Sequence, residues 1–218
     1  MVVKVSAGLM AGDRQSIAIT LEPSAKAEFL SQSYEKIHQM AEGEAIREGV
    51  VTVGRDATLF YAPLPVLPFA DSAFRSAFTI ELADETSRLF YSDILACGRA
   101  ARGERFAYRL YRSRVRIKSG GNLIYADNFR FAPQEDDVDC EGFTQYEGYT
   151  HLGNYLLCHF PVSEEALRDY LHATLAEHDC QAGLTRFGEG NLCVKILANG
   201  SEFLLTVQEA LKDFLRHL

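Results

Sequence analysis

Alternating apolar and polar residues mark most of residues 16–131 in this 218-residue chain. In the run Ser16–Glu22, the side chains of Ile17, Ile19 and Leu21 occupy every second position, the spacing of one face of a β-strand. Similar runs follow, broken by turn signals such as Gly120-Gly121, so a mainly β fold is predicted: a sandwich, a barrel or a coiled sheet. The expected strands are Ser16–Glu22, Lys26–Leu30, Ala45–Val53, Ala57–Tyr61, Arg75–Ala83, Ser87–Cys97, Arg105–Lys118 and Asn122–Phe131.

Two amphipathic helices are expected in the C-terminal part. Ser163 can cap the first helix, and both helices carry apolar residues at three- and four-residue intervals. This periodicity places one side of each helix against a core. The apolar residues are Leu167, Tyr170, Leu171 and Leu175 in the first helix, and Leu204, Val207, Leu211, Phe214, Leu215 and Leu218 in the second, over Ser201–Leu218.

The chain is predicted to form a single domain of residues 1–218, because no repeat, low-complexity tract or flexible linker divides it. Residues 1–133 are the β-rich part, and residues 142–218 hold two further strands, Asn154–Phe160 and Leu192–Ala198, with the two helices. The acidic run Glu135–Glu141 between them is expected to be a solvated loop. Three prolines make Ala62–Phe69 an extended crossing segment, since proline donates no ladder hydrogen bond.

Charge and cysteine content exclude several classes of protein. A net charge of −8 and a pI near 5.3 argue against sequence-independent binding to nucleic acid or anionic membranes. No apolar stretch approaches the roughly 18 residues that span a bilayer, and the N-terminus lacks the apolar region of a signal peptide. The five cysteines form no C-x-x-C pair, so we expect reduced, mostly buried thiols in a cytoplasmic protein.

The segment Ser31–His38 carries the densest cluster of reactive side chains. Glu35, Lys36 and His38 lie within four residues and fit a catalytic trio, a metal relay or a solvated strand edge. In a strand, Lys36 and His38 share one face, and Glu35 shares the other with Ile37, which disfavours a trio. Because the sequence also lacks the strong local enzyme signatures, a cofactorless hydrolase using these three residues is only an alternative.

Two other groups of residues have a functional and a structural interpretation. Cys158 and His159 could bind a borderline metal, but neighbours in a strand point to opposite faces, so Cys158 is expected in the core. A basic series, Arg112, Arg114, Arg116 and Lys118, shares one face of a predicted strand. This face is either a solvated sheet surface or a contact surface for an acidic protein partner.

Several blocks, taken in their order along the chain, resemble the urease accessory proteins UreD, called UreH in some bacteria, with the UreH subgroup closest. That family usually carries further strands before the first block, so the chain is expected to lack the usual N-terminal strands and to expose a sheet edge. The blocks are Ala7–Asp13, Ser31–His38, Ala62–Phe69, Tyr91–Arg99 with Gly103-Glu104, Tyr125–Asn128 and Glu147–His151.

The resemblance implies a layered or β-helix-like fold, with antiparallel or mixed sheets and two C-terminal helices. It also implies a non-enzymatic scaffold for urease maturation, which links apo-urease to UreF and, through UreF, to the GTPase UreG, and helps to pass nickel to urease. No catalytic residue, stable metal site or bound cofactor is expected, only transient nickel, and the protein could dimerise within the complex. A generic β-scaffold that binds a protein without handling metal is the second alternative.

The same resemblance suggests roles for individual residues. Four carboxylates are expected to line a hydrated nickel path, because oxygen ligands give weaker and more exchangeable sites than thiolates. Lys36, His38, Arg99 and Glu104 are expected to be structural or partner-facing. The apolar side chains of Phe214, Leu215 and Leu218 are expected to serve UreF binding in part. The path carboxylates are Asp13, Glu35, Asp93 and Asp127.

Overall fold

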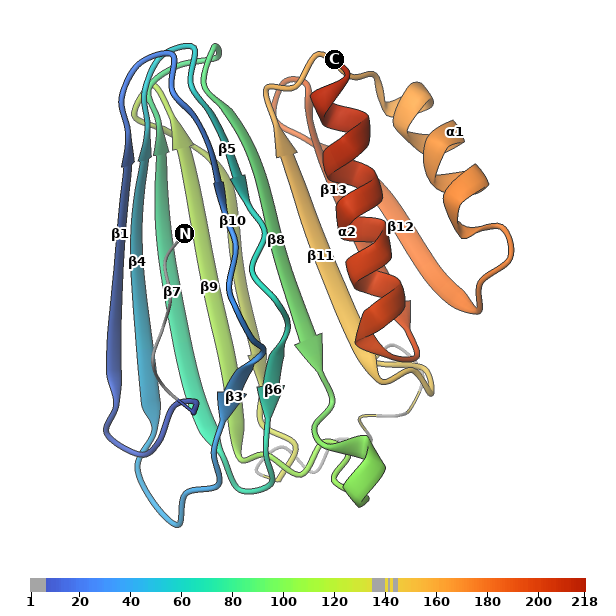
Figure 1. The fold of residues 1–218 in the computed structure, drawn as a ribbon. Coiled ribbons are helices and arrows are strands. Elements are labelled where there is room, and N and C mark those ends of the chain that lie inside the picture. Colours follow the sequence, from blue (N-terminus) through green and yellow to red (C-terminus); the bar gives the residue numbers. More distant parts are fainter. Residues whose placement is uncertain (1–6, 135–139, 141, 143–144) are drawn as a thin grey trace.

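Two β-sheets face each other in the computed structural model, which describes residues 7–134, 140, 142 and 145–218 (Figure 1). The predicted acidic loop lies outside the described residues apart from Cys140. The first sheet has five strands, of which β1, β4, β7 and β9 are parallel and β10 is antiparallel. Its strands, in spatial order, are β1 (Arg14–Leu21), β4 (Ala45–Val53), β7 (Ala73–Leu82), β9 (Leu110–Ser119) and β10 (Asn122–Phe131).

The second sheet has eight strands and mixes both orientations. Strands β2, β5 and β8 are parallel, whereas β8, β11, β13 and β12 form antiparallel pairs. In spatial order it contains β12 (Cys180–Phe187), β13 (Asn191–Ala198), β11 (His151–Cys158), β8 (Arg88–Ala96), β5 (Thr58–Tyr61) and β2 (Lys26–Phe29), with β6 (Val66–Pro68) beside β8 and β3 (Glu35–Ile37) beside β6.

The first half of the chain coils between the two sheets. After β1 in the five-stranded sheet, β2 and β3 lie in the other sheet, β4 returns, and β5 and β6 lie beside β2 and β3. Each turn of this coil places a strand parallel to the equivalent strand of the previous turn, which is the arrangement of a β-helix. The predicted β-rich, layered or β-helix-like fold with two C-terminal helices is therefore confirmed.

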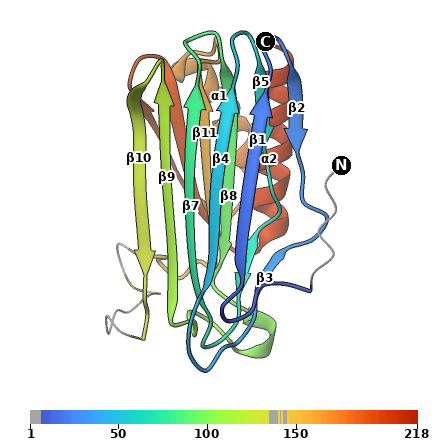
Figure 2. The same ribbon diagram turned by 90° about the vertical axis from the view of Figure 1, so that its left-hand side faces the viewer.

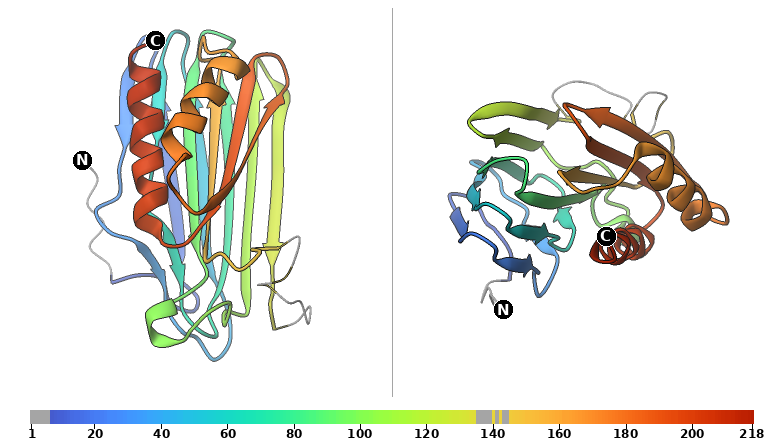
Figure 3. Two further views of the ribbon diagram at one scale, coloured as in Figure 1. Left: turned by 90° about the vertical axis from the view of Figure 1, so that its right-hand side faces the viewer. Right: turned by 90° about the horizontal axis from the view of Figure 1, so that it is seen from above.

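Both helices cover the outer face of the eight-stranded sheet (Figure 3). Helix α1 (Glu164–Leu175) begins after Ser163, whose Oγ accepts a hydrogen bond from the Ala166 N–H at 3.1 Å, as predicted for the cap. Helix α2 (Ser201–Arg216) buries Leu204, Val207, Leu211 and Leu215 completely or almost so. Neither helix is long and apolar enough to cross a lipid bilayer.

The structure corrects the sequence-based boundaries in a few places. Strand β12 was not predicted, because both of its faces are largely exposed and its sequence shows no alternation. The strand expected from Arg105 begins only at Leu110, since Phe106 adopts a left-handed backbone conformation with a φ of 52°. Leu218 was expected to be buried by the last helix, but it follows the end of α2 and is 50% exposed.

The outer face of the five-stranded sheet has no helix over it in the described part of the chain (Figure 2). Arg114 and Arg116 are exposed there, while Val115 and Ile117, which alternate with them, are buried, so the predicted division of faces is confirmed. Use of this basic face by an acidic partner stays a prediction. The expected burial of the thiols is confirmed for Cys97, Cys140, Cys158 and Cys193, whereas Cys180 is half-buried.

Three of the family-like blocks, Ala7–Asp13, Ser31–His38 and Ala62–Phe69, contact one another. Leu9 pairs with Ile37, and its N–H donates to the Lys36 carbonyl at 2.8 Å. Gly8 lies so close to this segment that a β-carbon there would stand 2.4 Å from the Lys36 oxygen, which only glycine avoids. The Phe69 N–H donates in turn to the Ile37 carbonyl at 2.9 Å. Blocks that are distant in sequence thus stabilise one another through the backbone.

Candidate functional site

A band of polar side chains crosses the interior between the two sheets. In the five-stranded sheet the pairing register aligns Gln15 with Arg47, Arg47 with Ser76, and Ser76 with Ser113, so these residues form one row across four strands. In the other sheet Asp93 pairs with Asn154, and Asn154 with Lys195. The first row lies near the beginning of its strands and the second near the middle of its own, and apolar clusters lie on either side of the rows along the strands. We call the two rows, together with Glu35 and Asp127, the polar band.

Side chains connect the two sheets across this band. Arg47 forms an ion pair with Glu35 at one side of the sandwich. In the middle, the Ser113 Oγ donates to an Asp93 carboxylate oxygen at 3.3 Å. At the far side, the Lys195 Nζ lies 3.3 Å from an Asp127 oxygen. The band therefore alternates basic, acidic and hydroxyl groups from one side of the interior to the other.

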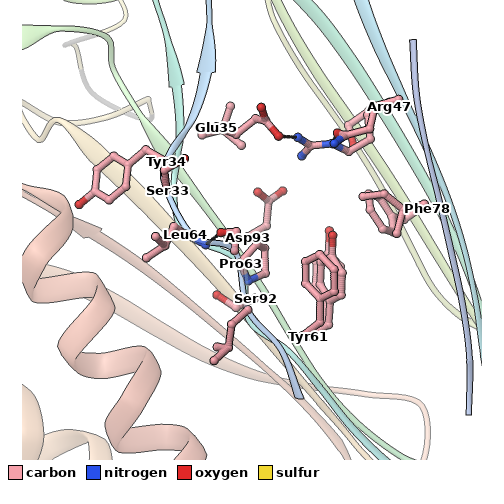
Figure 4. Close-up of a pocket in the computed structure, with 18 of the residues that line it drawn as sticks. Ser33, Tyr34, Glu35, Arg47, Tyr61, Pro63, Leu64, Phe78, Ser92 and Asp93 are labelled. Carbon is pink, nitrogen blue, oxygen red and sulfur yellow. Dashed lines mark hydrogen bonds and ion pairs between the residues drawn. The ribbon is translucent and has the colours of Figure 1, made fainter. Parts of the chain in front are cut away.

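Two cavities meet at Asp93. The larger has a volume of about 420 Å³ and includes Glu35, Arg47 and Tyr61 in its wall (Figure 4). The smaller, of about 30 Å³, is lined by Asp127, Lys195 and other members of the band. Asp93 belongs to the lining of both cavities. Its carboxylate thus lies deep in the molecule yet retains accessible surface, because it faces an internal space.

The surroundings of Asp93 destabilise its ionised form. Burial raises the pKa of this carboxyl above its ordinary value, and the negative charge of Asp127 adds to the effect. The positive charge of Arg47 and the hydrogen bond from Ser113 act in the opposite direction but do not cancel it. Asp93 therefore holds its proton to a higher pH than an exposed aspartate.

Arg47 is the most enclosed charged group of the band. Its side chain is 10% exposed, its Nε donates to the Gln15 Oε1 at 2.6 Å, and its guanidinium lies over the Phe74 ring at 5.2 Å from the ring centre. In Figure 4 the guanidinium extends toward Glu35 above the carboxylate of Asp93. Gln15, Glu35 and Phe74 together fix the position of this cation at the wall of the larger cavity.

Three of the four carboxylates expected on a nickel path belong to the polar band: Glu35, Asp93 and Asp127. The structure does not bring Asp13 to them. Asp13 is exposed, and its Oδ2 accepts a hydrogen bond from the Met10 N–H at 2.8 Å, which closes a surface turn. Asp13 thus lies outside the site that the other three build.

The remaining predicted residues lie away from the band. Lys36 is exposed, and a His38 ring nitrogen lies 3.1 Å from the Ala7 carbonyl oxygen. Glu35 instead faces the interior, so the side chains of the hydrolase alternative point in different directions. Arg99 pairs with Glu104, and this guanidinium lowers the pKa of the Glu104 carboxyl.

The apolar C-terminal residues differ in their surroundings. Leu215 is 3% exposed in the core, and the ring of Phe214 stacks on Tyr170 of α1 with centroids 4.4 Å apart. Leu218 is the exposed one of the three. A partner could therefore reach Leu218 without disturbing the core.

Sequence reasoning missed six of the nine residues of the polar band. Arg47, Ser113, Asn154 and Lys195 sit in ordinary alternating strands, and nothing local distinguishes them from other inward-facing positions. Their one signal is that they share a register with polar residues on neighbouring strands, and register follows only from the fold. Among the residues that the structure describes, no group of three histidine, cysteine or acidic side chains could enclose a metal ion. The oxygen atoms of the polar band instead lie one after another between the sheets and do not surround a single point.

Known proteins resemble this chain over almost its full length. The profile of the family described as UreD urease accessory protein matches residues 1–218. The urease accessory protein UreD of Acetivibrio thermocellus is 36% identical over 215 residues, covering 99% of this chain and 81% of that protein. The urease accessory protein UreH of Helicobacter pylori strain G27 is 34% identical over 209 residues, covering 96% and 77% respectively. The chain therefore belongs to the UreD family of urease accessory proteins.

Proposed function

We propose that this protein is a non-enzymatic scaffold of urease maturation and that nickel crosses it along the polar band. The observation that carries the proposal is the position of Asp93, which lines both internal cavities and lies between the carboxylates of Glu35 and Asp127. These acidic groups form a series through the interior of a protein whose relatives are named urease accessory proteins. Membership of that family explains why an interior route for a metal ion would be useful.

The chemistry of the band suits transit better than storage. Carboxylate, hydroxyl and amide oxygens bind Ni²⁺ more weakly than thiolates or imidazoles, so the ion can leave each position. Burial raises the pKa of the Asp93 carboxyl, and because a metal ligand must be deprotonated, a proton competes with an arriving ion for this group. This competition weakens nickel binding at Asp93 and so favours release of the metal.

The partners proposed are apo-urease and UreF, with the GTPase UreG reached through UreF. UreF could contact the apolar side chain of Leu218, which is exposed. Leu215 packs in the core, and Phe214 stacks on Tyr170 of α1. Nickel is the cargo of this assembly, held transiently. The assembly could contain two copies of the chain, and we place it in the cytoplasm.

Replacing the central carboxylate tests the route directly. In cells that co-express UreF, UreG and apo-urease, Asp93→Asn should reduce nickel-dependent urease activation by at least about tenfold, because even outer-shell changes at metal sites have effects of this size. Complex formation with UreF and apo-urease should persist. Asp169→Asn, at an exposed position on α1, is the matched control and should activate urease normally.

Further variants separate the alternatives. Glu35→Gln and Asp127→Asn should also reduce activation, whereas Asp13→Asn should not if the route follows the geometry rather than the sequence blocks. Full activation by the Asp93, Glu35 and Asp127 variants would favour a scaffold that binds its partners without handling metal. Failure of the wild-type chain to co-purify with UreF or apo-urease would reject the maturation role itself.

A further inference from the structure

We propose that Arg47 is a built-in plug of the nickel route: its guanidinium occupies the space beside Asp93 that a metal ion must cross. This inference rests on the proposed function, since it concerns the regulation of the same route. The chain would have a closed state, with the guanidinium beside Asp93, and an open state in which the guanidinium has moved away from Asp93.

The position of Arg47 supports this role. Its side chain is 10% exposed, and the Glu35 carboxylate that it contacts is 16% exposed, so the ion pair lies inside the sandwich rather than at its rim. Both Arg47 and Asp93 line the larger cavity. The positive charge also reaches the buried groups around it, because it acts against the raised pKa values of both Asp93 and Tyr61. A cation in this cavity therefore shares the space beside Asp93 with the guanidinium.

Electrostatics make the plug effective. A guanidinium stays protonated at every physiological pH, so Arg47 cannot yield by losing its charge. At short distance inside a protein, the repulsion between a unit positive charge and a divalent ion far exceeds thermal energy. The same guanidinium already neutralises Glu35, one of the carboxylates that would attract nickel. Arg47 thus both repels the ion and occupies one of its ligands.

Space for an open state is present next to the guanidinium. The neighbouring cavity of about 420 Å³ exceeds the volume of an arginine side chain, so the guanidinium can turn without disturbing the core. The backbone of Arg47 is fixed, since β4 is paired along its length with β1 and β7. Glu35 belongs to the three-residue strand β3, which is more easily displaced. Movement of the Glu35 segment would therefore remove the ion pair that holds the guanidinium, leaving only the contacts with Gln15 and Phe74.

That segment is tied to helix α2. The hydroxyl of Tyr34, next to Glu35, lies 2.7 Å from the Ser201 Oγ at the beginning of α2. The Ser31 Oγ accepts a hydrogen bond from the Leu64 N–H at 2.7 Å, which anchors the other side of the segment. A partner that shifts α2 would thereby pull on the residues that hold the plug. This contact gives the closed state a route by which assembly could open it.

Nickel titration of the isolated full chain tests the plug. By calorimetry with Ni²⁺ alone, Arg47→Gln should bind at least about tenfold more tightly than wild type, because the cavity loses a positive charge and frees Glu35. Arg47→Lys keeps the charge and should bind no more tightly than wild type. The matched control is Arg75→Gln on the neighbouring strand, which breaks a similar ion pair with Glu44 on the outer face and should leave nickel affinity unchanged.

The result that overturns the plug is wild-type nickel affinity in folded Arg47→Gln, or equal gains in Arg47→Gln and Arg47→Lys. Should Arg47→Gln fail to fold, the double variant Glu35→Gln with Arg47→Gln replaces the ion pair by two neutral amides. This double variant should bind Ni²⁺ more tightly than Glu35→Gln alone, and equal affinities would also reject the proposal.

Failure of the plug can be told from failure of the route. If Asp93→Asn abolishes urease activation but Arg47→Gln leaves nickel affinity unchanged, the route stands and the plug is rejected. If Asp93→Asn activates urease normally, both are rejected. Tyr34→Phe, which removes the contact with Ser201, should raise nickel affinity less than Arg47→Gln does, and no gain at all would reject the link to α2.

Discussion

The two faces of the eight-stranded sheet differ in what fills them. Toward the helices, Phe90 and Ile94 of β8 pack against the buried leucines of α2 in a continuous apolar core. On the opposite face of the same strand, Asp93 borders two cavities and a row of polar groups. Strand β8 thus faces a filled apolar core on one side and the polar band with its cavities on the other. Stability and the proposed function therefore depend on different faces of one strand.

The helix side shows that this chain can satisfy a buried polar group when packing alone is required. There the Ser92 Oγ donates to the Gln208 Oε1 at 2.5 Å, and both residues are fully buried. Across the strand, the fold instead leaves an unfilled volume of about 420 Å³ beside buried charges. Cavities and buried ion pairs both tend to reduce stability compared with a well-packed apolar interior. A buried ion pair also lies on the helix side, where the 2% exposed side chain of Lys212 contacts Glu28 and Glu209. The inner face differs because its buried charges border an unfilled volume, which Asp93 lines.

The largest expected effect on stability comes from the filled face. Leu211→Ala in α2 should lower the free energy of unfolding by about 2–5 kcal/mol, because Leu211 is fully buried and the alanine leaves a cavity. Urea unfolding followed by circular dichroism measures the change. Thr206→Ala, at an exposed position on the same helix, should change stability by less than about 0.5 kcal/mol. Similar losses in the two variants would contradict the described core.

Sequence patterns predict these two faces unequally. The apolar stripe of α2 was predictable because its residues recur within a single helix, and Leu204, Val207 and Leu211 are buried as expected. The carboxylates Glu35, Asp93 and Asp127 were singled out through family-like blocks rather than through geometry. Arg47 could not be found in this way, because its role depends on a Gln15 contact 32 residues away and on Glu35 in the opposite sheet. Register between distant strands is a property of the folded chain.

On the face of β8 that borders the cavities, the free energy of unfolding should depend on pH through Asp93. Burial raises its pKa above the ordinary value of 3.8, so the folded state binds this proton more tightly than the unfolded state. The folded protein therefore loses stability as pH rises through the native pKa of Asp93, whereas Asp93→Asn cannot ionise and escapes this loss. Urea unfolding at a series of pH values should show that the free energy of unfolding of Asp93→Asn rises relative to that of wild type over the pH range in which Asp93 ionises. A difference that stays constant with pH would contradict the burial of this carboxyl.

The two ion pairs of the polar band should differ in importance. The side chains of Lys195 and Asp127 are 48% and 28% exposed, so solvent weakens their interaction, in contrast to Arg47 and Glu35. Lys195→Met should change the free energy of unfolding by less than about 1 kcal/mol and should raise nickel affinity less than Arg47→Gln does. Lys118→Met, which breaks a surface pair with Glu81, is the matched control. A larger gain in nickel affinity from Lys195→Met than from Arg47→Gln would place the plug at the other side of the band.

The smallest effect on stability is expected where the filled face ends. Leu218 follows α2 and is 50% exposed, so Leu218→Asp should change the free energy of unfolding by less than about 0.5 kcal/mol. If UreF covers this residue, the buried carboxylate would have no counter-charge, and co-purification with UreF should weaken. Leu123→Asp, at an apolar position in β10 that is 57% exposed, is the control and should leave UreF binding intact. Equal UreF recovery from both variants, with unchanged stability, would remove Leu218 from the proposed contact while leaving the metal route untouched.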